Sequence, residues 1–302
     1  MSFSSDVKGE LCRLPLERQE SVLAEAYGVL LFCNQFSRGG VRITTLSPDF
    51  ARRLPELFQR AFGLEFDELP QPEQPGKLSF FLRRPEAIEA VLNAFGSDLG
   101  SHTAHHINYA VLEGEGTHAA FCRGAFLAGG SVTDPVKGYH LELTTSHLHV
   151  HRELQALIPE LGLQPRSTTR KSNYITYLKR STSISTFLSA IGAPECAQEI
   201  ARARASKSLL NSVNRQYNCD VANVDKAVAA AQNQIDAIRV LERTGALSGL
   251  PEALQETAQV RCSNPELSLS QLAAMLNPPV SKSCLNHRLR KLQELASEQT
   301  AD

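Results

Sequence analysis

The sequence predicts an α+β protein, with a duplicated α/β domain at the N-terminus and an all-α helix-turn-helix domain at the C-terminus. Three observations support this prediction. The length of 302 residues is enough for about two domains of roughly 100–200 residues each. One pattern of helices and strands occurs twice in the first two thirds of the chain. The last third shows only helical periodicity, and a proline-containing turn separates its final two predicted helices.

The first domain is predicted from an internal duplication. Residues 78–96 align with residues 174–192 at a constant offset of 96 residues, and the same offset pairs Gly28 with Gly124. Each copy, about 17–96 and about 113–192, is predicted to follow the order αββαββα. Two such copies would pack about a pseudo-two-fold axis, and their paired sheets would form a saddle suited to a nucleic-acid duplex. The alternative is that the duplication serves only to build a core.

The domain boundaries are predicted from changes in composition. Residues 1–210 form the duplicated domain, and residues 211–220, NSVNRQYNCD, are polar and are expected to be a flexible linker. Residues 221–302 form the second domain. It is expected to begin with an Ala-rich helix over about 221–244 and to continue with a short helix over about 252–261.

The helix-turn-helix is predicted from capping residues, a helix break and apolar spacing. Ser268 or Ser270 can cap the first helix, and its buried positions would be Leu269, Leu272, Ala273 and Leu276. Pro278 and Pro279 end that helix, because proline cannot continue it. Ser281 can cap the next helix, and the apolar positions there are Leu285, Leu289 and Leu292.

The second helix of this motif is the predicted DNA-reading element. In a helix-turn-helix this helix lies in the major groove, where Asn suits adenine and Arg suits guanine. No acid occurs from Val280 to Gln293. The alternative is an amphipathic helix that packs on a partner. The predicted DNA-binding residues are Lys282, Ser283, Asn286, His287, Arg288, Arg290 and Lys291.

A second basic region lies in the first domain. The formal net charge is −1, so attraction to DNA must come from local clusters of charge. No acid occurs between Glu160 and Glu195. The basic residues in this stretch could contact the phosphate backbone, although a solvated surface is the alternative; they are Arg166, Arg170, Lys171, Lys179 and Arg180.

Composition argues against several other classes of protein. The seven cysteines form no C-x-x-C pair, which is typical of reduced thiols in a cytoplasm. No apolar run approaches the roughly 20 residues that span a bilayer, and no phosphate-binding or nucleophile motif occurs. His102, His105, His106 and His118, with the alternating His147, His149 and His151, could suggest zinc, but surface histidines are the preferred interpretation. We expect no metal, no cofactor and no catalytic residue.

The segment FCRGAFLAGGSV, residues 121–132, resembles the LAGLIDADG motif of homing endonucleases. In that family two such helices pack along the two-fold axis, and each delivers an acid to a divalent metal. The resemblance places Gly129 and Cys33 at the two acid positions. Without carboxylates no hard cation is held and no water is activated for cleavage. We therefore expect the scaffold without the nuclease activity.

The whole chain resembles the WhiA family of Gram-positive bacteria. The similar segments include MSFSSDVKGEL, RGAFLAGGSVTDP, NSVNRQYNCDVAN and SKSCLNHRLRKLQELA. The resemblance implies a LAGLIDADG-type domain joined to a helix-turn-helix domain. It also implies a non-catalytic DNA-binding regulator, linked to cell division and chromosome segregation and, in sporulating relatives, to sporulation.

Two other functions stay open at this point. One is a protein-interaction scaffold in cell division, with DNA binding secondary, and the other is a residual nuclease. The expected partners are double-stranded DNA and, as a further candidate, another regulatory protein, with no membrane. The expected location is the cytoplasm, at the nucleoid.

Overall fold

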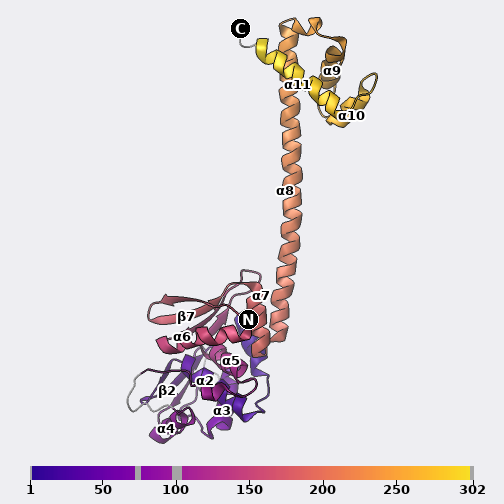
Figure 1. Ribbon diagram of the computed structural model, residues 1–302. Helices are drawn as coiled ribbons and strands as arrows, with labels where there is room; N and C mark the ends of the chain where they lie inside the picture. The colour runs from indigo at the N-terminus through magenta and orange to yellow at the C-terminus, as the bar shows by residue number, and fades with distance from the viewer. Residues whose placement is uncertain (1, 72–75, 97–103, 300–302) are drawn as a thin grey trace. The chain divides into compact units, whose positions relative to one another are not determined.

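The computed structural model describes residues 2–71, 76–96 and 104–299. The chain divides into two compact units, Met1–Ser208 and Leu209–Asp302, and Figure 1 labels several of their helices and strands.

The first unit contains the predicted duplication. The first copy consists of α2 (Gln19–Phe32), β1 (Gln35–Ser37), β2 (Gly40–Thr45), α3 (Pro48–Phe62), β3 (Leu78–Leu82) and α4 (Pro85–Ala94). After a short 3-10 helix, Tyr109–Leu112, the second copy consists of α5 (Thr117–Gly129), β4 (Gly130–Val132), β5 (Leu141–Thr145), α6 (Leu148–Leu157), a second 3-10 helix (Ile158–Leu161), β6 (Arg166–Arg170), β7 (Asn173–Leu178) and α7 (Ser181–Ile191).

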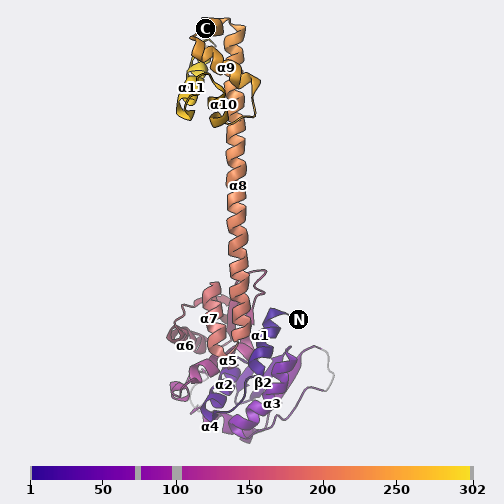
Figure 2. The same ribbon diagram turned by 90° about the vertical axis from the view of Figure 1, so that its right-hand side faces the viewer.

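Helices α2 and α5 pack against each other at the centre of this unit, as Figures 1 and 2 show. Glycine permits their close approach. A Cβ on Gly28 would lie 2.1 Å from the carbonyl oxygen of Phe121, and one on Gly124 would lie 2.0 Å from that of Glu25. Any larger residue at either position would force the two helices apart. The pair that the internal alignment matched is therefore the pair at the contact.

Each copy forms an antiparallel sheet, in the order β1-β2-β3 and in the order β4-β5-β7-β6. The registers are equivalent, because Arg42 pairs with Phe81 in one sheet as Glu142 pairs with Tyr177 in the other. Side chains alternate between the faces of a strand. Leu141, Leu143 and Thr145 of β5 are accordingly buried, whereas the side chains between them point to the other face.

The described residues of the first copy lack one predicted strand. The counterpart of β6 is reduced to an isolated bridge between Glu68 and Phe81. The sequence that follows the bridge contains prolines at positions 70, 72 and 75. Proline has no N–H to donate to a ladder, so Pro70 explains why the described residues 69–71 do not extend the pairing beyond this bridge.

Helix α1 (Phe3–Cys12) precedes the first copy and was not predicted. Phe3, Val7 and Leu11, four residues apart, are all buried, and the Ser2 side chain caps the helix. The polar composition of residues 1–11 concealed this spacing.

The Glu10 carboxylate of α1 links this helix to the first turn of α8. It accepts hydrogen bonds from the backbone N–H groups of Glu195, at 2.7 Å, and Cys196, at 2.9 Å.

The second unit is entirely helical among its described residues. It contains most of α8 (Pro194–Arg243), a 3-10 helix (Ala246–Gly249), α9 (Glu252–Ser263), α10 (Leu269–Met275) and α11 (Lys282–Gln299). Its core is built from α8, α9, α10 and α11, and includes Ile238, Leu241, Ala258, Leu272 and Leu289. Nowhere in the described ranges is there a helix with both the length and the apolar character needed to cross a membrane.

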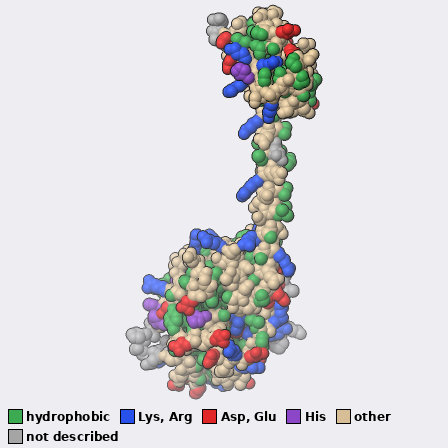
Figure 3. All heavy atoms as spheres, turned by 45° about the vertical axis from the view of Figure 1, so that its right-hand side comes forward, with side chains coloured by type: hydrophobic (Ala, Val, Ile, Leu, Met, Phe, Trp, Pro, Cys, Tyr) green, Lys and Arg blue, Asp and Glu red, His purple; other side chains and the backbone are tan. Residues whose placement is uncertain are grey.

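The expected flexible linker at residues 211–220 is wrong, because α8 continues through it. From Glu195 to Arg243 the sequence has neither glycine nor proline, the two residues that most disfavour a helix. A polar composition is equally consistent with a solvated helix. Figure 3 shows hydrophobic side chains along one side of α8; the exposed ones include Leu210, Val213, Tyr217, Val224 and Val228.

Candidate nucleic-acid interface

The helix-turn-helix is fixed by caps at the start of both helices. The Ser268 hydroxyl accepts a hydrogen bond from the backbone N–H of Gln271, whose side chain accepts one from the backbone N–H of Ser268 at 3.0 Å. This is a complete capping box. The Ser281 hydroxyl accepts from the backbone N–H of Cys284 at 3.1 Å. The turn between the helices is closed by the backbone N–H of Val280, which donates to the carbonyl of Ala273 at 3.0 Å.

One face of α11 is buried and sets the direction of the other. Leu285, Leu289, Leu292 and Ala296 are buried at helical spacing. Arg261 of α9 supports the loop before α10, because its guanidinium donates to the carbonyls of Pro265 and Leu267, both at 3.0 Å. Helix α11 is thus held by apolar packing beneath it, and the buried Arg261 supports the neighbouring loop.

The opposite face of α11 is exposed and free of acids over its first half. Ser283, Asn286, His287 and Arg290 lie at the i, i+3, i+4 and i+7 positions and are all exposed, as is Lys282. Residues at this spacing lie on one side of a helix. These five predicted site residues are therefore brought together on one accessible surface, and Figure 3 shows Lys and Arg side chains on an exposed face of this unit.

The other two predicted residues of α11 have contacts within the chain. Arg288 is half-buried, and its guanidinium donates to the carbonyl of Ala253 at 3.4 Å. Lys291 lies 3.6 Å from the Glu294 carboxylate, and both side chains are largely exposed. Such a surface ion pair is weak, so Lys291 can exchange this partner for a phosphate, whereas Arg288 would first have to leave α9.

The basic residues of the first unit gather around the edge strand of the second sheet. Every residue of β6 is exposed, and Arg166 and Arg170 lie on the same face of it. Lys171 occupies the turn that follows, with a left-handed φ of 56°. Lys179 and Arg180 are exposed between β7 and α7. Arg166, Arg170 and Lys171 thus follow the edge of this sheet, and Lys179 and Arg180 follow the end of its neighbouring strand β7. We call this group of five residues the basic sheet face.

Each sheet has one cation-aromatic pair at an equivalent position. The Nζ atom of Lys179 lies 5.4 Å from the centre of the Tyr177 ring beside the second sheet, and the guanidinium of Arg83 lies 4.9 Å from the centre of the Phe81 ring beside the first. The internal alignment pairs these positions with each other. One acid, Glu142, lies on the second sheet and pairs with Arg170 at 3.5 Å. It reduces the positive charge of the basic sheet face without removing it.

Cys33 and Gly129, which the resemblance places at the acid positions of homing endonucleases, carry no charge and are closely surrounded by backbone atoms. The Cys33 Sγ atom lies 3.1 Å from the backbone carbonyl oxygens of both Leu30 and Gln35, either of which can accept its one hydrogen, and burial raises its pKa to about 12. A Cβ on Gly129 would lie 2.5 Å from the carbonyl oxygen of Thr144. The backbone has therefore closed around Gly129, and a carboxylate cannot be accommodated there without a shift of β5.

The histidines have structural partners. His105 is buried and contacts the Phe36 carbonyl at 2.7 Å, and His106 pairs with Glu153 at 2.8 Å. His147 precedes α6, and burial lowers its pKa to about 4. His151 bonds to Thr176 and Gln155, while His102 lies outside the described residues. In the described part of the chain, no group of three or more His, Cys, Asp or Glu side chains is arranged to hold a metal.

These features define a class of protein, in which a duplicated LAGLIDADG-like α/β unit without its acids is joined to a helix-turn-helix unit. Residues 118–209 match the family model of the WhiA LAGLIDADG-like domain, and residues 213–296 match that of the WhiA C-terminal HTH domain. The chain is 35% identical, over 98% of its length and 97% of the relative, to the "Probable cell division protein WhiA" of Ruminiclostridium cellulolyticum.

A second relative of the same name, from Clostridium perfringens, is 34% identical over 99% of this chain and 98% of the relative. The crystal structure of full-length DUF199/WhiA from Thermatoga maritima shares the fold, with a TM-score of 0.59 and 24% identity over 99% of both chains. The chain belongs to the WhiA family.

Proposed function

We propose that the chain is a non-catalytic DNA-binding regulator that acts in cell division, as the names of its relatives suggest. The observation that supports this most directly is the exposed face of α11, where Asn286 and Arg290 lie together above a well-packed core. Side chains of these types read base edges in the major groove. Its site of action would be the nucleoid, and its effects would be on transcription and chromosome segregation, and on sporulation where the organism sporulates.

The roles of the two basic regions differ in this proposal. Ser283, Asn286, His287 and Arg290 would read sequence, while Lys282, Arg288 and Lys291 would hold phosphates beside them. The basic sheet face would add attraction that does not depend on sequence. The nuclease alternative lacks support, because Cys33 and Gly129 supply no carboxylate for a metal.

The recognition helix is tested by replacing Arg290 with Ala. We expect a loss of about 1–3 kcal/mol on the preferred duplex and relaxed preference at one base position, because a bidentate contact to guanine is lost. The preferred duplex would come from a genome-wide footprint, and fluorescence anisotropy would compare it with a scrambled duplex. Arg239→Ala, at an exposed arginine of α8, is the matched control. Unchanged affinity and preference would show that α11 is misassigned.

A protein-interaction scaffold is a second candidate, favoured by the exposed apolar side chains of α8. Comparison of preferred and scrambled duplexes over a range of salt separates the two functions. A DNA regulator should keep a preference for one duplex in addition to the salt-dependent attraction to phosphates, which comes from counterion release. A scaffold with incidental DNA binding would bind both duplexes with the same affinity and the same salt slope.

A further inference from the structure

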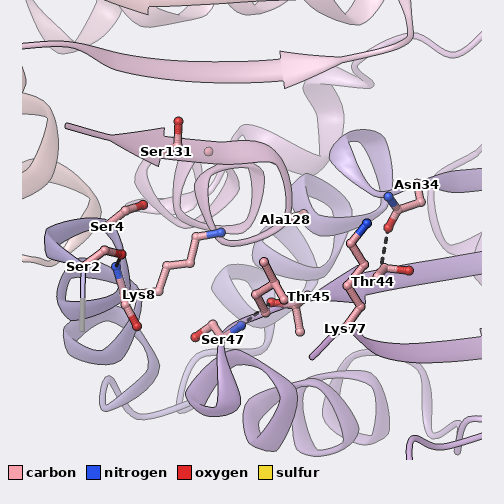
Figure 4. Close-up of a pocket in the computed structure, with 13 residues that line it drawn as sticks. Ser2, Ser4, Lys8, Asn34, Thr44, Thr45, Ser47, Lys77, Ala128 and Ser131 are labelled. Carbon is pink, nitrogen blue, oxygen red and sulfur yellow. Dashed lines mark hydrogen bonds between the residues drawn. The ribbon is translucent and has the colours of Figure 1, made fainter. Parts of the chain in front are cut away.

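A cavity of about 480 Å³ opens beside the ends of the two central helices. Residues from α1, from the end of β2 and the turn after it, and from the end of α5 and β4 surround it, together with Asn34 before β1 and Lys77 before β3, as Figure 4 shows. Its lining is polar and contains two lysines, Lys8 and Lys77, and several hydroxyl groups. None of its lining residues among the described part of the chain is an acid. The cavity is therefore suited to an anion and unsuited to a metal ion.

Lys8 reaches the cavity from α1. Its ammonium group donates to the carbonyl of Leu127, near the end of α5, at 2.9 Å. An ammonium group has three N–H donors, so this bond leaves two of them for a ligand. The side chain is half-buried, and no described carboxylate forms an ion pair with it. Burial lowers the pKa of Lys8 to about 8, which is the expected response of a cation held without an anion.

Three of the hydroxyl groups around the cavity have a hydrogen available to donate. The oxygens of Ser2, Ser4 and Ser47 accept hydrogen bonds from the backbone N–H groups of Ser5, Val132 and Phe50, at 3.2, 3.4 and 3.3 Å. A hydroxyl whose oxygen already accepts keeps its own hydrogen for another acceptor. Lysine ammonium groups with serine and threonine hydroxyls are the side chains that contact phosphate oxygens in protein–nucleic-acid complexes.

We propose that this cavity binds a phosphate group. Lys8 and Lys77 supply the positive charge, and hydroxyls including those of Ser4 and Ser47 donate hydrogen bonds to the phosphate oxygens. The cavity lies next to Cys33 and Gly129, because Asn34 and Gly130 line it. A lysine from α1 thus occupies the region from which the acids are missing. The phosphate could belong to a DNA backbone or to a free phosphorylated molecule, and the test separates these sources.

The test uses the full chain with Lys8→Met and Lys77→Gln variants. Lys137→Gln, at an exposed lysine in the turn after β4, is the matched control. Calorimetric titration with pyrophosphate measures the free ligand, and anisotropy over a range of salt measures a duplex. The Arg290→Ala variant is included, because it should affect only the preferred duplex. Thermal midpoints of all variants establish that each is folded, and Lys77→Gln, at an exposed side chain, leaves the buried structure untouched.

Two results would support the proposal. A free ligand is indicated if Lys8→Met and Lys77→Gln each weaken pyrophosphate binding about tenfold or more while Lys137→Gln does not. A backbone phosphate is indicated if they weaken preferred and scrambled duplexes equally and each lowers the salt slope by about one. The proposal is overturned if neither variant changes either titration, or if Lys137→Gln changes them as much. Arg290→Ala can still lower duplex preference in that case, so failure of the cavity and failure of the proposed function are distinguishable.

Discussion

Glu25 shows how one buried residue connects three helices of the first unit. Its carboxylate is fully buried and receives the guanidinium of Arg53 at 2.6 and 3.0 Å and that of Arg123 at 2.7 Å. These side chains come from α2, α3 and α5. A buried charge is tolerated when it is paired and hydrogen-bonded. The network therefore holds α3 in place against the central helix pair. Strand β2, whose end lines the cavity, precedes α3 and is positioned with it.

Glu25→Gln should destabilise the first unit by about 3–5 kcal/mol, because it leaves two buried guanidinium groups without a counter-charge. Urea unfolding measures the change. Glu115→Gln removes an exposed carboxylate that also pairs with an arginine, Arg18, and should have almost no effect. Equal losses in the two variants would contradict the assignment of the stability to burial.

Lys8 is predicted to lower stability in a way that depends on pH. Its pKa is lowered from 10.5 to about 8 by burial. Below pH 8 the group is charged in both the folded and the unfolded chain, so the full penalty for burying charge applies. Between pH 8 and 10.5 the folded protein has released the proton while the unfolded chain still binds it, so stability rises with pH.

Lys8→Met should therefore be more stable than the unchanged protein at pH 7, and the difference should shrink as the pH rises toward 10.5. Urea unfolding of both proteins in phosphate-free buffer at pH 7 and pH 10 measures it. Other titrating groups are common to both proteins and cancel in the difference. A difference that is constant with pH would mean that Lys8 is not a buried cation.

At the scale of the element, α8 differs along its length. Ala231, Ile235, Ile238 and Leu241 are buried, and the last two belong to the core of the second unit. Over residues 209–228 the described side chains are exposed. Helices in proteins gain most of their stability from packing of one face. The part of α8 without such packing should therefore open more readily than the rest of the same helix.

Hydrogen exchange should show this contrast. We expect amides of residues 209–228 to exchange faster than those of residues 231–243, because the described side chains of the first segment are exposed and bury no apolar face. Peptide-level exchange followed by mass spectrometry resolves the two segments within one sample, so the second serves as the control. Equal protection would show that another surface covers the apolar side chains of the first segment, which would strengthen the scaffold hypothesis.

At the scale of the whole molecule, the sequence predicted what depends on local pattern. Internal alignment matched Gly28 with Gly124, the glycines at which α2 and α5 approach each other, and the helix-turn-helix follows from Ser268, Ser281 and the leucine spacing. The cavity could not be predicted, because Lys8 and Leu127, which meet there, are 119 residues apart in the chain. The linker prediction failed because polar residues are compatible with both a coil and a solvated helix.

The charge distribution leads to a last prediction, which concerns the whole molecule. With a net charge of −1, the protein has no general attraction for DNA, so non-specific affinity must depend on local clusters. Replacing Arg166, Arg170 and Lys171 together by Gln should weaken preferred and scrambled duplexes equally and lower the salt slope by up to about three, because each lost phosphate contact lowers it by about one. Anisotropy titrations over a range of salt measure both quantities.

The control removes the same charge from exposed positions of the same unit that lie outside the basic sheet face. It combines Arg13→Gln, Arg18→Gln and Arg60→Gln. If that control lowers affinity as much, net charge alone governs binding and the basic sheet face has no special role; if the triple variant loses preference rather than affinity, the sheet, and not α11, reads the sequence.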